Sequence, residues 1–145
     1  MPKVSKSALL SYSAAQIFNL VNDIPAYPEF LPWCSGARVL RQDDNMVEAS
    51  VEISHSGVNK SFTTRNILTP YESIELNLLD GPFKSLQGVW RFQALQENAC
   101  KVSLDLQYEF SSKLLGLVVG PVFNQIANSL VDAFCERAKS VYGES

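Results

Sequence analysis

The feature that most constrains this chain is a long region of alternating apolar and polar residues, followed by a single segment with helical periodicity. The clearest example lies in residues 100–110, where apolar residues at even positions alternate with polar residues at odd positions. Such a period of two is typical of a strand with one buried and one solvated face. The apolar face of these strands must be covered by another element.

Seven segments have this strand-like character. Short turns connect the last six of them, each to the next. The predicted strands are residues 4–12, 37–42, 47–53, 60–68, 74–78, 86–92 and 100–110. Turn-forming sequences such as Asp43-Asp44-Asn45, His55-Ser56-Gly57 and Asp80-Gly81-Pro82 separate consecutive strands. Because connections this short join antiparallel neighbours, we predict one antiparallel sheet of seven strands.

Helical signals occur at two places. Ser13 and Gln16 form a capping-box pattern ahead of apolar residues at helical spacing, and Pro25 ends that helix. The proline-rich segment 25–33 has room for one further helical turn. Ser111 or Ser112 can cap a C-terminal helix that runs to about Tyr142, with Gly143 as its stop signal. Its predicted inner stripe comprises Leu115, Val118 or Val119, Val122, Ile126, Leu130, Phe134, Ala138 and Val141.

This order of elements predicts the α+β class: a curved antiparallel sheet around one long C-terminal helix, with one or two short helices after the first strand. At 145 residues the chain corresponds to a single domain spanning residues 1–145. Its net charge of −3 argues against nonspecific nucleic-acid binding. The strongest apolar run, residues 114–123, is about half of the ~20 residues that a membrane span requires.

The cysteines and the N-terminus favour a cytoplasmic protein. Cys34, Cys100 and Cys135 are far apart and show no metal-binding spacing, so we expect reduced, buried thiols. No secretory pattern opens the sequence.

The sequence offers little support for catalysis. His55 is the only histidine and lies in a predicted turn, so a Ser–His or Cys–His pair would need this exposed position as its base. Glu48 and Glu52 lie on the wet face of their strand, which is typical of surface charge. We therefore predict that the chain is not an enzyme and requires no cofactor or metal.

Polar and aromatic residues at unusual positions suggest a binding cavity instead. Arg65 and Asn66 lie in the middle of a strand, where an inward side chain needs a partner such as a ligand headgroup or an ordered water. The alternative, which the sequence favours, is that they point to solvent or form cross-strand pairs. Phe30, Leu31 and Trp33 either cover an open end of the sheet or form the mouth of an apolar cavity.

Several separated motifs, in order along nearly the whole chain, resemble those of a known family. They are residues 12–23, 27–32, 62–66, 80–84, 90–92 and 122–139. They resemble the bacterial RatA-type proteins, which belong with the mitochondrial coenzyme Q-binding proteins in the START-like, polyketide cyclase-related superfamily. The resemblance implies a helix-grip fold without cyclase chemistry.

The resemblance also implies two different functions. The first is non-enzymatic binding of ubiquinone or a similar polyprenyl lipid between sheet and helix, in support of respiration. The alternative is the toxin of a toxin–antitoxin pair, which associates with the large ribosomal subunit, blocks subunit joining, and has a small partner protein encoded nearby. Transient membrane contact is compatible with the first function, and no specific DNA is implied by either.

Our leading hypothesis is the lipid-binding function. Arg65 and Asn66 are the headgroup candidates, and Phe30, Leu31 and Trp33 would form the mouth. The predicted cavity residues, taken from the apolar faces, are Leu76, Leu78, Leu86, Trp90, Leu104, Val122, Phe123 and Ile126. For the alternative, Lys60, Arg65, Lys84 and Arg91 would form a basic patch if their side chains share one face; the other interpretation is isolated surface charges. The acidic net charge disfavours broad contact with ribosomal RNA and permits docking on a basic ribosomal protein or a local basic patch.

Overall fold

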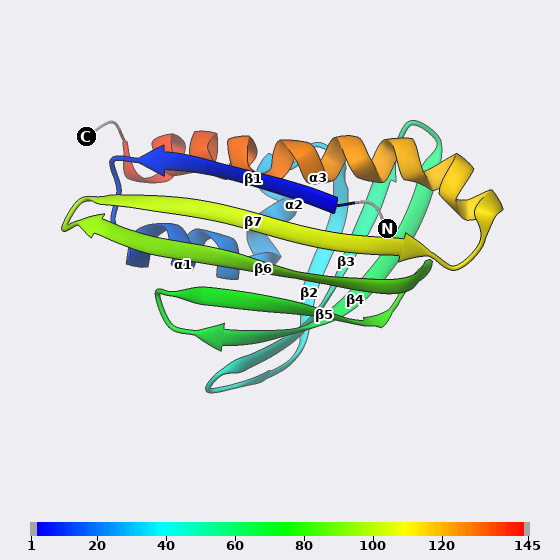
Figure 1. Cartoon of the computed structure of the whole chain (residues 1–145), viewed down its shortest axis with the longest axis horizontal. Helices are drawn as coiled ribbons and strands as arrows, with labels where there is room; N and C mark the ends of the chain where they lie inside the picture. Colours follow the sequence, from blue (N-terminus) through cyan, green and yellow to red (C-terminus); the bar gives the residue numbers. More distant parts are fainter. Residues whose placement is uncertain (1–2, 144–145) are drawn as a thin grey trace.

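Residues 3–143, the part of the chain that the computed structural model describes, form one antiparallel sheet and three α-helices (Figure 1). The strands are β1 (Lys3–Leu10), β2 (Cys34–Asp43), β3 (Met46–His55), β4 (Val58–Thr69), β5 (Ser73–Asp80), β6 (Phe83–Gln96) and β7 (Ala99–Phe110). The helices are α1 (Ala14–Asn22), α2 (Tyr27–Phe30) and α3 (Lys113–Tyr142), and a 3₁₀ turn, η1, spans Ile24–Ala26.

The sheet has the strand order β1-β7-β6-β5-β4-β3-β2. Each strand from β2 to β7 pairs with its neighbour in sequence, and β1 adds to the free edge of β7. Ser56 and Gly57 join β3 to β4 with positive φ angles of 50° and 80°, as a two-residue turn of matching twist requires. Figure 1 shows β2, β3 and β4 running steeply across the direction of β6 and β7, so the sheet curves around α3.

The long helix α3 supplies the cover that the apolar side of the sheet requires. Its buried residues are Val119, Phe123, Ile126, Ala127, Val131, Phe134 and Ala138. The C-terminal end of α3 is tied to the segment around α1, where Tyr12 Oη donates to Gly143 O at 2.5 Å and Tyr142 Oη donates to Gln16 O at 2.9 Å.

The predicted fold class is confirmed, including the seven strands, their antiparallel order and the long C-terminal helix. The capping box of Ser13 and Gln16 is present, and Ser112, not Ser111, caps α3. Strands β2 to β6 all extend beyond the predicted ranges.

The predicted inner stripe of α3 is partly wrong. Val119 is the buried member of the Val118–Val119 pair, and Phe123 is more deeply buried than Val122. Val141, predicted to face inward, is 48% exposed. The curvature of the sheet sets the line along which the sheet contacts α3. The helical periodicity of the sequence alone does not specify that line.

The outward side of the first turns of α3 is also apolar. Leu114, Leu117 and Val118 are between 58% and 77% exposed. By length and composition, α3 is the one helix within residues 3–143 that is apolar enough to cross a membrane, but its inner stripe forms part of the core. The core helix of a soluble protein passes the same test.

Candidate functional site

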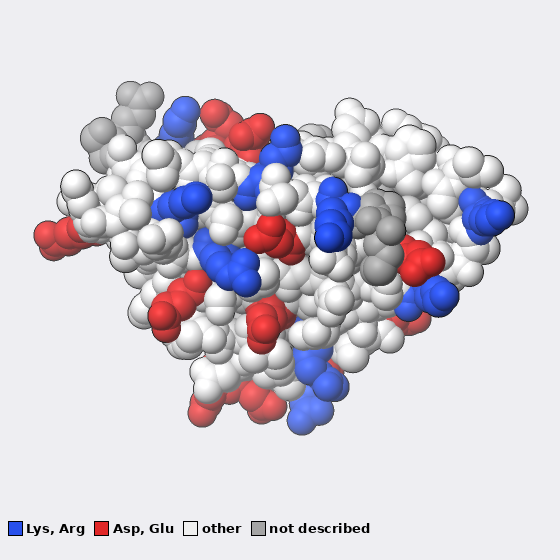
Figure 2. All heavy atoms as spheres, viewed as in Figure 1, with Lys and Arg blue, Asp and Glu red and all other residues white. Residues whose placement is uncertain are grey.

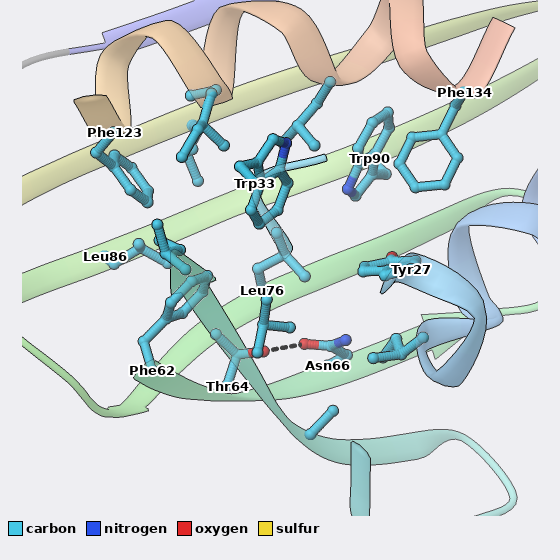
Figure 3. Close-up of a pocket in the computed structure, with 18 residues that line it drawn as sticks. Tyr27, Trp33, Phe62, Thr64, Asn66, Leu76, Leu86, Trp90, Phe123 and Phe134 are labelled. Atoms are coloured by element: carbon cyan, nitrogen blue, oxygen red, sulfur yellow. Dashed lines mark hydrogen bonds between the residues drawn. The ribbon is translucent and has the colours of Figure 1, made fainter. Parts of the chain in front are cut away.

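A cavity of about 100 Å³ lies between the concave side of the sheet and α3 (Figure 3). It is lined by Ile24, Tyr27, Trp33, Ala49, Val51, Ile53, Phe62, Thr64, Asn66, Leu76, Leu86, Trp90, Leu106, Phe123, Ile126, Ala127, Leu130 and Phe134. An apolar cavity of about 150 Å³ holds one benzene molecule, so this volume approaches what a single ring requires.

Alternation along the strands decides which side chains reach the cavity. On β4, Phe62, Thr64 and Asn66 point inward because they are two residues apart. On α3, Phe123 and Phe134 point toward the sheet and flank the cavity at opposite ends of the view in Figure 3. The wall is therefore built from residues that are distant in sequence and adjacent in the fold.

Aromatic side chains enclose the cavity at both ends. At one end, Phe83 and Phe123 pack edge to face with 4.9 Å between ring centroids, and Phe62 and Tyr108 join them. At the other end, Phe134 contacts Tyr27, Phe30 and Trp90 with centroid separations of 5.5, 5.3 and 5.4 Å. These contacts give the site a rigid frame, because offset and edge-to-face ring pairs favour defined geometries.

Two hydrogen-bonded polar residues interrupt the apolar wall. Thr64 Oγ1 donates to Asn66 Oδ1 at 2.7 Å, and the two side chains belong to residues only 8% and 5% exposed. Figure 3 shows this pair on β4, with the amide of Asn66 on the side of the cavity where Tyr27 lies. Tyr27 Oη donates to Val21 O, and burial raises the pKa of this hydroxyl above its usual value, so it stays neutral.

The structure brings most of the predicted cavity residues together. Leu76, Leu86, Trp90, Phe123 and Ile126 line the cavity, as do Asn66 and Trp33. Leu78, Leu104 and Val122 do not line it. Leu104 is enclosed in the core, and Leu78 and Val122 pack against the core while only partly buried.

Arg65 does not lie beside Asn66 in the cavity, which corrects the predicted pairing of these two residues. Successive residues of a strand point to opposite faces, so only one of them can face α3. Arg65 lies on the outer face, with Nη2 3.0 Å from Glu48 Oε1. Of the predicted mouth, Phe30 packs on Phe134 outside the lining set, and Leu31 is a core residue, 1% exposed.

Several lining residues were missed by the sequence analysis. Ile24 and Tyr27 come from η1 and α2, which are too short to show a periodic pattern in the sequence. Thr64 and Phe62 lie two and four residues before Asn66 on β4, so they point to the same face as Asn66. The sequence alone could have indicated this. Phe134 was predicted to lie on the inner stripe of α3 but was not connected with the cavity.

The cavity suits the binding of an uncharged molecule more than acid–base chemistry. Of the 18 residues that line it, none is an aspartate, glutamate, histidine, lysine, arginine or cysteine. His55, at the end of β3, is not among them. The groups available for recognition are therefore aromatic rings, aliphatic groups, the polar atoms of Asn66, Thr64 and Tyr27, and the indole N–H groups of the two tryptophans.

Two basic residues of the outer face, Arg65 and Arg91, are paired with carboxylates. Arg65 pairs with Glu48, and Arg91 Nη1 lies 3.1 Å from Asp105 Oδ2. Figure 2 shows basic and acidic side chains interspersed over the visible face, with no continuous area of one sign. Two members of the hypothetical patch of Lys60, Arg65, Lys84 and Arg91, the two arginines, are thus paired with carboxylates.

Comparisons with known proteins agree with this architecture. The family described as polyketide cyclase / dehydrase and lipid transport matches residues 10–135. The ribosome association toxin RatA of Vibrio cholerae is 55% identical over 144 residues, covering 99% of this chain and 100% of that protein. A mitochondrial coenzyme Q-binding protein homologue of Xenopus laevis is 27% identical, covering 96% of this chain and 59% of that protein.

Among solved structures, the Zhui aromatase/cyclase from Streptomyces sp. R1128 superposes with a TM-score of 0.82 and covers 99% of both chains. The two sequences are only 15% identical. This structure therefore supports the fold and no more than the fold.

Proposed function

Because this chain belongs to the polyketide cyclase / dehydrase and lipid transport family, with RatA proteins as full-length relatives, we propose that it associates with the ribosome and acts as a toxin. The observation that carries this proposal is the 55% identity over the entire length of a protein named for ribosome association. The fold alone persists at 15% identity, so identity at 55% exceeds what the core requires. Sequence identity beyond the level that the fold requires favours a shared surface and a shared binding partner.

We propose further that the large subunit is the target and that binding blocks its joining to the small subunit. Overexpression followed by sucrose-gradient sedimentation at low magnesium tests both steps. We expect free subunits to increase at the expense of joined ribosomes, and the tagged chain to sediment with the large subunit. Unchanged profiles, with the chain remaining at the top of the gradient, would contradict the proposal.

The charge distribution favours a protein surface over broad contact with ribosomal RNA. The net charge is −3, and two outward arginines are already paired with carboxylates. A protein that neutralises many phosphates loses affinity steeply as salt rises. Its binding constant falls about tenfold per tenfold rise in salt concentration for each phosphate neutralised. We therefore expect co-sedimentation with the large subunit to weaken little between roughly 50 and 200 mM salt. A steep loss would indicate RNA contact.

The cavity supports a second candidate function, the binding of an apolar ligand. Its support is the enclosed apolar wall described above and the distant relationship to a coenzyme Q-binding protein. Burial of one methylene group contributes about 0.8 kcal/mol, so a ring-sized group alone provides useful affinity. A cavity of 100 Å³ does not hold a complete polyprenyl chain unless side chains move.

The ligand is best sought on the purified protein. We propose to produce the chain in a quinone-synthesising bacterium and to analyse an organic-solvent extract by mass spectrometry. A quinone or polyprenyl species at a stoichiometric amount is the expected result. An empty extract, with no binding of added ubiquinone, would contradict the second function and leave the first intact.

We also propose that neither function involves catalysis or a resident cofactor. The support is chemical: the lining residues supply no carboxylate, imidazole or amine for proton transfer. A bound quinone would therefore be recovered unchanged from the protein.

A further inference from the structure

The outward side of the first turns of α3 carries a continuous apolar stripe. The stripe, called the outer stripe, consists of Leu114, Leu117, Val118 and Pro121, whose spacing places them on one face of the helix. Leu114, Leu117 and Val118 are between 58% and 77% exposed, and Pro121 is also exposed. Single exposed apolar residues are ordinary on a protein surface, whereas a contiguous group marks an interaction site. Since the inner stripe of α3 already covers the sheet, the outer stripe is free to contact another surface.

The polarity of this outward side changes in steps along α3. After the outer stripe, the exposed residues are polar but uncharged, namely Asn124, Gln125, Asn128 and Ser129. Exposed acidic side chains begin only with Asp132 and continue with Glu136. From residue 113 to residue 131, Lys113 is the single charged residue, so the start of α3 is locally basic in a chain of net charge −3. Figure 2 shows the end of the molecule where α3 begins as a largely uncharged area.

The size and composition of the outer stripe favour a lipid surface over a protein partner or a second copy of the chain. The stripe exposes roughly 400 Å², about half of the ~800 Å² that each partner buries in a stable protein complex. It contains no aromatic, arginine or methionine side chain, the types that are enriched at protein interfaces. A lipid surface requires no matching contact area, because each aliphatic side chain gains free energy by itself when it leaves water.

We propose that the first turns of α3 dock on an anionic lipid surface. In this arrangement the outer stripe lies at the boundary between headgroups and acyl chains, and Lys113 contacts the headgroup phosphates. The stripe runs about 10 Å along the helix axis, which suits shallow insertion of one helix face and is too short for a membrane span. Lys113 lies one turn before Leu117, and a lysine side chain is long enough to reach the phosphates while the helix lies deeper. The inference rests on neither proposed function.

Flotation of the full chain with lipid vesicles tests the proposal. One kind of vesicle is made of phosphatidylcholine alone, and the other also contains phosphatidylglycerol as the anionic lipid. We expect the chain to bind both kinds and to bind the anionic vesicles more tightly. High salt should reduce this preference and leave binding to phosphatidylcholine intact, because salt screens charges but does not weaken the burial of apolar groups.

Variants separate the apolar contact from the charge. Leu117→Asp should weaken binding to both kinds of vesicle by about tenfold or more, because it removes a buried leucine and adds a charge. Leu9→Asp is the matched control, since Leu9 on β1 is 73% exposed and Leu117 is 77% exposed. Lys113→Gln should lower the affinity for anionic vesicles about fivefold and leave that for phosphatidylcholine unchanged. Circular dichroism checks that the variants are folded.

A nitroxide-labelled lipid identifies the surface that touches the membrane. The full chain is bound to small bicelles that carry the nitroxide on an acyl chain, and its methyl resonances are followed by NMR. We expect the methyl resonances of Leu114, Leu117 and Val118 to broaden strongly, and those of Leu9 to remain sharp.

Three results would overturn the proposal: no binding to either kind of vesicle, equal losses in Leu117→Asp and Leu9→Asp, or broadening centred on another surface. If Leu117→Asp keeps vesicle binding but no longer sediments with the large ribosomal subunit, the outer stripe is a protein contact and the lipid proposal fails. Loss of vesicle binding in Leu117→Asp, with unchanged subunit profiles, supports it. Should a variant not fold, the wild-type binding and the broadening of the stripe methyl groups still decide the question.

Discussion

Asn66 and Arg65 show how much a single position along a strand decides. The two residues are neighbours in sequence, yet Asn66 is buried in the cavity wall and Arg65 is paired with Glu48 on the outer face. A strand turns every second side chain to the same face, so a functional hypothesis that includes both must be wrong for one of them. For a residue in a strand, the face of the sheet that its side chain occupies therefore matters more than its chemical type.

Phe134 holds together the aromatic rings at one end of the cavity. It is 1% exposed and contacts Tyr27, Phe30 and Trp90. We expect Phe134→Ala to lower the free energy of unfolding by about 3–5 kcal/mol, because the transfer and cavity terms add. Urea denaturation measures this loss, and Val141→Ala on the same helix, at a 48% exposed position, serves as the control. Equal stability of the two variants would refute the role assigned to Phe134.

Buried thiols and phenols predict a loss of stability at alkaline pH. Burial raises the pKa of Tyr27, Cys34, Cys100, Tyr108, Cys135 and Tyr142 above their usual values. Each group then releases its proton more readily in the unfolded chain than in the folded one. Their contribution is fully present below the unfolded-state pKa values, about 8.5 for thiols and about 10 for phenols, and falls as pH rises above them.

The measurement is the free energy of unfolding from pH 7 to 11. Cys100→Ala should reduce the slope that begins near pH 8.5, because it removes one of the buried thiols. A free energy that stays constant across this range would show that burial of these groups has no such effect.

At the scale of the element, α3 combines a packed inner stripe with weakly constrained first turns. Gly116 and Gly120 face Phe110, with an added Cβ 3.6 and 3.7 Å from its ring, which is ordinary contact distance. Glycine inside a helix costs conformational entropy that alanine does not. These glycines therefore lower the stability of the helix without making room for a close neighbour.

Gly116→Ala should raise the free energy of unfolding by about 0.5–1 kcal/mol, which is the difference in helix propensity. The opposite result is expected for Gly88→Ala on β6. There an added Cβ would lie 2.7 Å from Leu106 Cδ1 and 2.8 Å from the backbone oxygen of Asp105. Overpacking of this kind costs about 1–3 kcal/mol. Thermal unfolding of both variants tests the pair, and a change of the same sign in both would contradict the argument.

The N-terminus of α1 provides a simpler test of element stability. Ser13 Oγ accepts from Gln16 N at 3.1 Å, and Gln16 Oε1 accepts from Ser13 N at 2.9 Å. Ser13→Ala removes the first bond and should cost about 1 kcal/mol. Chemical denaturation measures the cost, with Ser7→Ala on the exposed β1 as a control. A loss no larger than that of the control would mean that the cap contributes nothing.

At the scale of the whole molecule, the two proposed functions occupy different places. Ribosome association would use the outer surface, whereas ligand binding would use the interior between the sheet and α3. The structure therefore allows one function to be removed without the other. A variant that fills the cavity leaves the charged and polar exterior unchanged.

Ala49→Leu is such a variant, because Ala49 lines the cavity from β3 and is 2% exposed. We expect it to abolish binding of added ubiquinone and of any co-purified lipid, while subunit profiles after overexpression remain those of the wild type. Ala94→Leu on the exposed part of β6 is the matched control. If Ala49→Leu folds but loses the effect on ribosomes, the two functions are coupled through the cavity.

The sequence by itself determined the class of the fold and the order of its elements. Alternation in β7 and the other strands, the capping box at Ser13 and the long C-terminal helix depend on local periodicity and local hydrogen bonds, which residues near in sequence specify. Only the tertiary structure decided which side chains meet. The curvature of the sheet selects Phe123 in place of Val122, and the path of the segment after α1 brings Tyr27 to the cavity. Contacts of this kind join residues far apart in the chain, and no local pattern contains the geometry that brings them together.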